Sequence, residues 1–157
     1  MTISLVGPNV LKLLTVFHLC LNAAVYFKSV LGPVLFLIYI NDLIDVFGNS
    51  LSVKLFADDV KVYAVLDSDV KVHLLQEGLS RLKSWSEAWQ LDVSIHKCTV
   101  LHIGCDVKRT ANDCHSYTLG GIQLSDVCKT TDLGIIIDRK LRRFDEHITS
   151  VVRKAHI

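Results

Sequence analysis

The feature that most constrains the fold is a pair of alternating segments on either side of two adjacent aspartates. Between Ser52 and Val65, apolar residues alternate with lysines and aromatic residues both before and after Asp58 and Asp59. Period-two alternation is typical of half-buried strands, because successive side chains point to opposite faces of a sheet. The sequence therefore predicts an antiparallel hairpin over 52–65 with both aspartates at its turn.

The segments around this hairpin alternate between helical and extended patterns. Pro33 suits the first turn of a helix, and the apolar run that follows predicts a helix buried on most sides, with Asn41 and Asp42 facing outward. Ser68 is the expected N-cap of an amphipathic helix that contains Gly78. Helices are expected over 33–47, 68–89 and 144–155, and strands over 98–103, 117–119, 122–124 and 133–137. This order of elements predicts the α+β class.

The composition fits a single folded domain. The chain has 157 residues, of which 50% are hydrophobic and 21% charged, which excludes a disordered chain. Its 17 basic residues balance 16 acidic ones, so the net charge does not indicate nucleic-acid binding. The five cysteines form no CxxC pair, so a reducing compartment, nuclear or cytoplasmic, is favoured over a disulfide framework.

The first part of the chain has a charge pattern of its own. No acidic residue precedes Asp42. The segment 13–27 is mostly apolar but is interrupted by polar residues and is shorter than the ~20 residues that a membrane span needs. Lys12 before an apolar run is similar to a signal-peptide core, but nothing downstream is typical of a secreted protein. We expect a buried segment; membrane association of residues 1–28 is the alternative.

Asp58 and Asp59 are the first candidates for chemistry. Carboxylates are hard oxygen ligands that suit Mg²⁺, which takes one or two of them together with substrate phosphates. Two such ions, ~3.5–4 Å apart, can stabilise the attacking and leaving oxygens of a phosphoryl transfer. A solvated turn is the alternative, because aspartate is common in β-turns. The dipeptide alone does not decide between them.

Longer motifs resemble a known family. The chain from Ser29 onward is similar to the reverse transcriptases of non-LTR, LINE-type retrotransposons in these segments: SVLGPVLFLIYINDL, LFADDVKVY, LKSWSEAWQLDVSIHKCTVLHIG, YTLGG, TDLGIIIDRKL and FDEHI. The resemblance implies an RNA-directed DNA polymerase whose palm is an antiparallel sheet backed by helices. It divides the chain into a non-matching leader (1–28), a partial palm (29–104), and a primer-grip region with the start of a helical thumb (105–157).

The resemblance also implies roles for individual residues. Asp58 corresponds to a metal ligand for Mg²⁺, and Asp59 to a supporting carboxylate at the same metal. Lys97 lies where the family places a lysine near the incoming triphosphate. The expected contacts with substrate, template or primer come from Phe56, Ser29, Gly32, Pro33, Leu133 and Gly134.

A basic cluster follows the primer-grip motif. Arg139, Lys140, Arg142 and Arg143 either form a solvated surface or contact the phosphates of an RNA template and a DNA primer. The resemblance favours the second role, and the residues themselves leave both open.

The sequence also departs from the family. The family polymerase needs another catalytic aspartate, on a strand that precedes the SVLGP motif and pairs beside the hairpin. This chain has no acidic residue before that motif, and the fingers region of the family is missing as well. We therefore expect a polymerase part that is inactive as this chain. A third carboxylate near Asp58 would overturn this expectation; the candidates are Asp42, Asp45, Asp67 and Asp92. The alternatives are a non-enzymatic remnant that binds nucleic acid or protein, and a non-functional relic.

A vacancy in the palm sheet would leave unpaired backbone groups at a strand edge. We expect part of the apolar leader, 11–27, to pack into or over this vacancy, because burial removes its apolar surface from water. An open edge that requires a protein partner to cover the exposed palm is the alternative.

Two further sets of residues have competing interpretations. A mixed zinc site could be formed by His96, Cys98, His102, Cys105, Cys114 and His115, but their spacing fits no standard zinc motif. Trp85 and Trp89 could stack on bases, yet they continue the apolar stripe of the helix over 68–89, so core packing is favoured.

Overall fold

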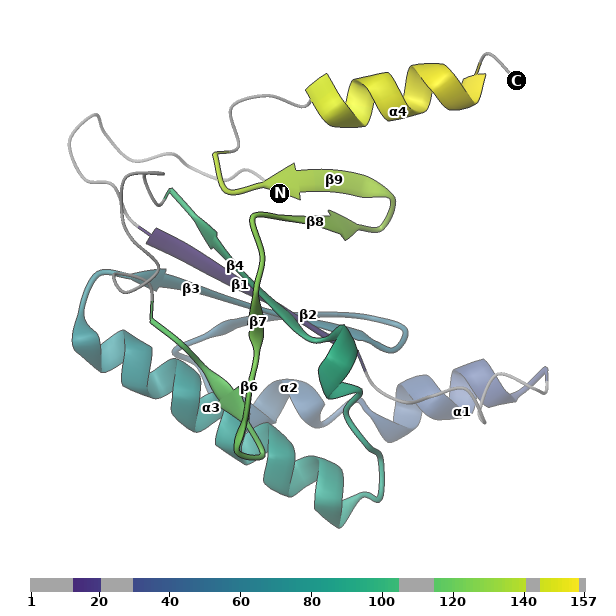
Figure 1. The fold of residues 1–157 in the computed structure, drawn as a ribbon. Coiled ribbons are helices and arrows are strands. Elements are labelled where there is room, and N and C mark those ends of the chain that lie inside the picture. Colours follow the sequence, from purple (N-terminus) through teal and green to yellow (C-terminus); the bar gives the residue numbers. More distant parts are fainter. Residues whose placement is uncertain (1–12, 21–29, 105–114, 141–144, 156–157) are drawn as a thin grey trace.

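A five-stranded sheet forms the centre of the protein (Figure 1). The computed structural model describes residues 13–20, 30–104, 115–140 and 145–155. The strand order is β2-β3-β1-β4-β7. The five strands are β1 (Leu13–Cys20), β2 (Ser52–Phe56), β3 (Asp59–Leu66), β4 (Thr99–Ile103) and β7 (Ser125–Asp126). All neighbours are antiparallel except β4 and β7, which pair in parallel.

The middle strand, β1, comes from the leader segment. It pairs with β3 from Leu13 opposite Leu66 to Cys20 opposite Asp59, and its other edge pairs with β4. This confirms the expectation that part of the leader packs into the sheet beside the hairpin. Because both edges of β1 are paired, neither β3 nor β4 presents an open edge at this position.

The predicted hairpin is present. Strands β2 and β3 pair with Phe56 opposite Asp59, and Ala57 and Asp58 form the two-residue turn. Asp59 thus begins β3, one position beyond the turn where it was expected. Ala57 has a φ of 50°, in the left-handed region that such tight hairpin turns use.

Helices cover one face of the sheet. The face of β3 that carries Val60 and Val62 packs in the main core. Over it lie α2 (Leu43–Val46) and α3 (Asp69–Ala88), with α3 running along the sheet, while α1 (Gly32–Tyr39) extends from α2 toward the right-hand side of the view (Figure 1). The buried hydrophobic side chains that these helices contribute are Phe36, Leu43, Leu75, Leu79, Leu82 and Trp85.

The expectation of one helix over 33–47, buried on most sides, was wrong. The chain forms a turn at 40–42 that separates α1 from α2, although Asn41 and Asp42 are exposed as expected. The exposed apolar side chains of α1 are Val34, Leu35, Leu37 and Ile38, each more than half exposed. A continuous apolar run specifies no particular face, so its pattern could not show which side chains would reach the core.

Helix α3 follows the prediction closely. It begins directly after Ser68, whose hydroxyl donates to Asp67 Oδ1 at 3.2 Å rather than capping the helix. Gly78 is buried, and a Cβ atom there would lie 3.0 Å from Leu51 Cδ1 and 3.1 Å from Phe47 Cδ1. The close approach of these two side chains explains why glycine occupies a helix interior.

Two small hairpins and a helix complete the fold. Strands β5 (Thr118–Leu119) and β6 (Ile122–Gln123) flank the predicted Gly-Gly turn. Strands β8 (Lys129–Asp132) and β9 (Ile135–Asp138) form a second hairpin, and α4 (Asp145–Ala155) is the last helix. No helix in the described parts of the chain is long and apolar enough to cross a membrane.

The strand predicted over 133–137 was misplaced. Leu133 and Gly134, with φ of 47° and 87°, form the turn between β8 and β9, and the strand begins at Ile135. Strand β8 was missed because its sequence, KTTD, has no apolar residue to alternate.

Candidate active site

The two aspartates lie at one end of the sheet, beside the end of the central strand. Asp58 is in the β2–β3 turn and Asp59 opens β3, and both are partly buried. Cys20, the last residue of β1, is directly opposite Asp59. Phe56, on the other arm of the hairpin, is 59% exposed, so an aromatic side chain is accessible at the turn. The turn and the end of β1 therefore form one compact corner of the sheet.

Strand β1 brings no carboxylate to this corner, since its sequence is LLTVFHLC. Asp42 instead accepts a hydrogen bond from Trp85 Nε1 at 3.3 Å, and Asp67 forms an ion pair with Lys71 at 2.7 Å. Asp45 and Asp92 are exposed. Within the described residues, no three His, Cys, Asp or Glu side chains lie close enough together to hold a metal ion.

This geometry can be compared with what a metal ion needs. Asp58 and Asp59 can supply the one or two carboxylates that Mg²⁺ takes when substrate phosphates complete its coordination. They do not match a two-metal arrangement, which needs carboxylates on both sides of the ions. Asp58 and Asp59 therefore fit part of the coordination shell of a single metal ion.

Lys97 lies at the same end of the sheet as the aspartates. It ends the short 3₁₀ helix η2 (Ile95–Lys97), two residues before Thr99, which pairs with His18 of β1. Its side chain is exposed, while the adjacent Cys98 is fully buried and its thiol donates to the Ser94 carbonyl at 3.2 Å. The three residues predicted to be catalytic are therefore gathered at one end of the sheet.

The residues predicted to contact substrate come from three other places. Gly32 is buried in the first turn of α1 and Pro33 is half-buried beside it, while Ser29 lies outside the described residues. Leu133 and Gly134 lie in the β8–β9 turn, with Leu133 56% exposed. In Figure 1, α1, the β2–β3 turn and the β8–β9 turn all lie toward the right-hand side of the molecule.

Arg139 has structural contacts that the sequence did not indicate. Its guanidinium forms an ion pair with Asp126, and its Nε donates to the Val127 carbonyl at 3.1 Å. The Gly104 amide donates to the Arg139 carbonyl at 2.9 Å, which ties the end of β4 to the end of β9. Arg139 thus lies at the end of the β8–β9 hairpin away from Leu133.

The structure describes one further member of the basic cluster, Lys140. Lys140 is exposed, and Arg142 and Arg143 lie outside the described residues. The nucleic-acid role of the cluster stays a prediction.

A buried lysine is the site feature that sequence reasoning missed. Lys61, two residues after Asp59, is 5% exposed and forms an ion pair with Asp132, the residue before Leu133. A lysine at an alternating strand position normally indicates a solvated face, so the pattern gave no sign of this pair.

The zinc and tryptophan hypotheses are answered in part. His96, Cys98, His102 and His115 form no metal-binding group among the described residues, and Cys105 and Cys114 lie outside them. The Trp85 side chain is in the core, as favoured. Trp89 is 39% exposed and packs edge-on against Tyr39, with ring centroids 4.9 Å apart.

Two buried titratable groups support the β5–β6 hairpin. The rings of His102 and Tyr117 lie 6.3 Å apart. Burial lowers the pKa of His102 and raises the pKa of Tyr117 to about 12, so both groups are neutral near pH 7. Gln76 of α3 makes two hydrogen bonds with the backbone of Thr118, at 2.9 and 3.0 Å, which dock the hairpin on the helix.

The structure has the arrangement that the resemblance leads us to expect of a polymerase palm. Helices cover one face of a mainly antiparallel sheet, Asp58 lies in a hairpin turn with Asp59 directly after it, and Lys97 lies at the same end of the sheet. The sequence model of the family described as reverse transcriptase (RNA-dependent DNA polymerase) matches residues 23–137. The chain belongs to this family.

Two curated relatives are similar to the chain over most of its length. The RNA-directed DNA polymerase from mobile element jockey of Drosophila funebris is 30% identical over 138 residues, which cover 83% of this chain. The protein of the same name from Drosophila melanogaster is 29% identical over 130 residues, 78% of this chain. The chain spans 14% of the length of each relative. These matches confirm the resemblance to non-LTR retrotransposon reverse transcriptases. The family uses divalent metal ions and binds a nucleic-acid template and primer.

Proposed function

We propose that this chain forms part of the palm and the start of the thumb of a non-LTR retrotransposon reverse transcriptase, and that as this chain it binds RNA template and DNA primer without extending the primer. The observation that carries the proposal is the position of β1. This strand lies between β3 and β4 and ends at Cys20, opposite Asp59, without contributing an acid.

The physical reason lies in the number of carboxylates. In-line phosphoryl transfer needs charge stabilisation at both the attacking and the leaving oxygen, which paired metal ions supply. The resemblance implies a strand beside the hairpin that carries a further aspartate. The position of β1 next to β3 supports the proposal that β1 stands in that place. Asp58 and Asp59 would hold one Mg²⁺ ion together with substrate phosphates, which supports binding more than turnover.

The other roles follow the positions of the residues. Exposed Lys97 would face an incoming triphosphate, and exposed Phe56 would contact substrate at the turn. The motif containing Ser29, Gly32 and Pro33 would contact template and nucleotide, and Leu133 with Gly134 would contact the primer. Arg142 and Arg143 would contact phosphates. Within this scheme residues 29–104 form the palm, 105–157 the primer grip and thumb start, and the strand of the 1–28 leader completes the sheet.

A metal-binding experiment tests the carboxylate argument directly. Cys20→Asp places an acid at the register position opposite Asp59, and opposed residues share a face of an antiparallel sheet. Titration with Mn²⁺, followed by electron paramagnetic resonance, should show about tenfold tighter binding than in the unchanged protein. Cys20→Asn, which has the same shape without charge, is the matched control and should change nothing. Equal affinity in both variants would show that β1 does not occupy the place of the missing ligand.

A second candidate function is a non-enzymatic module that binds a protein partner. The observation that favours it is the group of exposed apolar side chains on α1, where Leu35 and Ile38 are 59% and 67% exposed. Contiguous exposed apolar surface is typical of protein contact sites. Replacing both residues with glutamine, which adds no charge, should remove binding of the protein partner under this proposal. Unchanged partner binding in that variant would contradict it.

A further inference from the structure

The β2–β3 hairpin and the β8–β9 hairpin are joined by an ion pair between Lys61, whose side chain is buried, and Asp132, whose side chain is 18% exposed. We propose that Lys61 and Asp132 are positioning residues, which fix the Leu133-Gly134 turn relative to Asp58 and Asp59. This inference rests on the proposed function, since it takes the Leu133-Gly134 turn as the primer contact and Asp58 with Asp59 as the metal-binding site. The two partners are 71 residues apart in the sequence.

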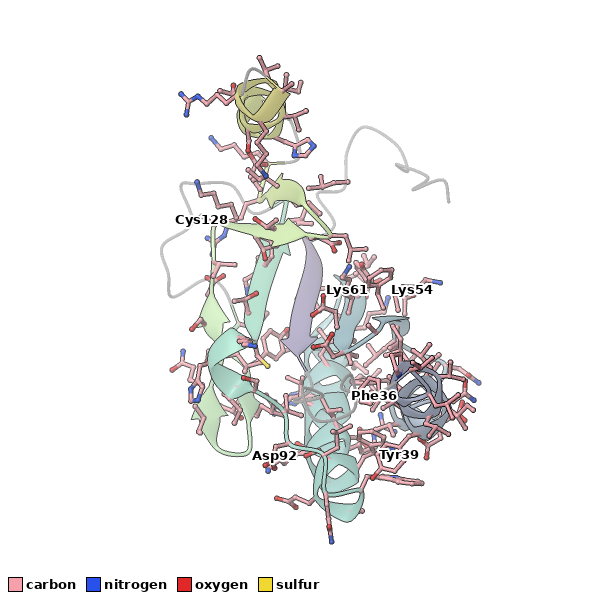
Figure 2. The ribbon with its side chains drawn as sticks, turned by 90° about the vertical axis from the view of Figure 1, so that its right-hand side faces the viewer. Phe36, Tyr39, Lys54, Lys61, Asp92 and Cys128 are labelled. Atoms are coloured by element: carbon pink, nitrogen blue, oxygen red, sulfur yellow. The ribbon has the colours of Figure 1, made fainter. Side chains whose placement is uncertain are left out.

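The position of the Lys61 side chain requires a partner of opposite charge. Its side chain is 7% exposed and it occupies the face of β3 opposite to the core residues Val60 and Val62. Its direct neighbours across the sheet are Lys54 of β2 and His18 of β1. Figure 2 shows the two lysines near each other, at the side of the sheet nearer to β8 and β9. A buried ammonium group beside a second lysine is costly unless a carboxylate faces it.

Asp132 supplies that carboxylate from the corner of the turn. It is the last residue of β8, pairs with Ile135 across the turn and directly precedes Leu133. Its side chain is 18% exposed. The ion pair itself places the carboxylate over the face of β3 that carries Lys61. Tyr63 lies on the same face, and its pKa is raised by burial and further by the Asp132 charge. Any displacement of the turn would therefore break the ion pair.

The far end of the hairpin is fixed separately. There Arg139 binds Asp126 and the Val127 carbonyl, and its own carbonyl accepts from the Gly104 amide. The hairpin is thus attached at its Arg139 end as well as at Lys61, and of these two contacts the Lys61 ion pair is the nearer to the Asp58-Asp59 turn. Loss of this contact should leave the hairpin attached at Arg139 while the Leu133-Gly134 turn moves away from its position.

Hydrogen–deuterium exchange on the full chain tests the attachment. In Lys61→Met and in Asp132→Asn, amides of residues 129–138 should exchange about tenfold faster, while those of β3, β4 and α3 stay protected. The charge-reversed double variant, Lys61→Asp with Asp132→Lys, should regain protection in part. Lys71→Met, which breaks the surface pair with Asp67, is the matched control and should not change exchange in the hairpin. Unchanged exchange in both single variants would overturn the proposal.

Photocrosslinking provides a readout that a merely stabilising contact would not move. A primer with a photoreactive 3′ nucleotide, annealed to RNA, should crosslink to the peptide that contains Leu133 and Gly134. In both single variants the yield at this peptide should fall about fivefold at equal total binding, and the charge-reversed variant should regain it. Unchanged yield despite faster exchange would overturn the positioning role. An unchanged protein that binds but never crosslinks there would overturn the proposed primer contact, and with it this inference.

Discussion

Cys20 and Asp59 are directly opposed across the antiparallel pair of β1 and β3, at the end of the sheet where Asp58 forms the turn. A strand from a segment that does not match the family motifs thus ends at the candidate metal site. Because this strand is acid-free, β1 adds no carboxylate to Asp58 and Asp59 at this corner.

Primer extension should be absent in the unchanged protein supplied with Mg²⁺, an RNA template, a DNA primer and nucleotides. One carboxylate pair cannot hold both metal ions of an in-line displacement. Gel analysis of primer length measures this, and Cys20→Asp is the variant in which extension should first become detectable. Extension by the unchanged protein that disappears in Asp58→Asn would refute the inactive assignment.

Template–primer binding should weaken steeply as salt rises, because contacts with phosphates release counterions. Neutralising both Arg142 and Arg143 to glutamine should reduce the slope of log affinity against log salt by roughly 1.4–1.8. Fluorescence anisotropy between low and physiological salt measures the slope. Lys71→Gln, on α3, is the control, because it also removes one positive charge. It should leave the slope unchanged. Affinity independent of salt would indicate an apolar partner.

Gly78→Ala should destabilise the fold, although alanine is the better helix former. The new methyl group would lie 3.0 Å from Leu51 Cδ1 and 3.1 Å from Phe47 Cδ1, so the core would have to shift. Overpacking outweighs the helix gain of about 1 kcal/mol, and a net loss of roughly 1–2 kcal/mol is expected in urea unfolding. Ser80→Ala, on the exposed side of α3, should not destabilise. A stabilised Gly78→Ala variant would show that this contact is loose.

Folding stability should fall as the pH drops below about 6.5, the ordinary pKa of histidine in an unfolded chain. His102 is fully buried; burial lowers its pKa, the Asp126 charge raises it, and the nearby Arg139 and His115 charges lower it. A group with a lowered pKa binds fewer protons when folded. The contribution of His102 to folding stability is therefore complete above its pKa in the unfolded chain. It is lost as the pH falls toward its pKa in the folded protein.

Urea midpoints from pH 8 to pH 5 measure this effect. His102→Gln should flatten the dependence of the midpoint on pH, whereas His73→Gln, at an exposed position of α3, should not. Equal slopes in the two variants would assign the pH dependence to other groups.

Local sequence patterns were sufficient to predict the β2–β3 hairpin and α3. In the hairpin, Val60 and Val62 alternate with Lys61 and Tyr63, and this alternation depends only on neighbouring residues. Helix α3 has its apolar residues at spacings of three and four and a boundary at Ser68. In both cases the period of the sequence equals the period of the backbone, so the element could be predicted without its partners.

Non-local packing decided the features that were missed. The apolar run of α1 has no preferred face, and only the position of the sheet selects Phe36 for the core. Strand β8 has no apolar pattern, and it exists because β9 pairs with it. Arg139 belongs to a basic cluster by sequence, yet its partner Asp126 is known only once β7 and β9 are placed.

By itself, the sequence determined the family, the secondary structure around Asp58 and Asp59, and the absence of an acid before Asp42. Only the tertiary structure decided that Leu13–Cys20 forms the central strand and that Lys61 is neutralised by Asp132. The physical reason is the distance along the sequence over which each interaction acts. Propensity and periodicity act over a few residues, whereas strand pairing and the burial of a charge depend on groups that lie far apart in the sequence and meet only in the folded chain.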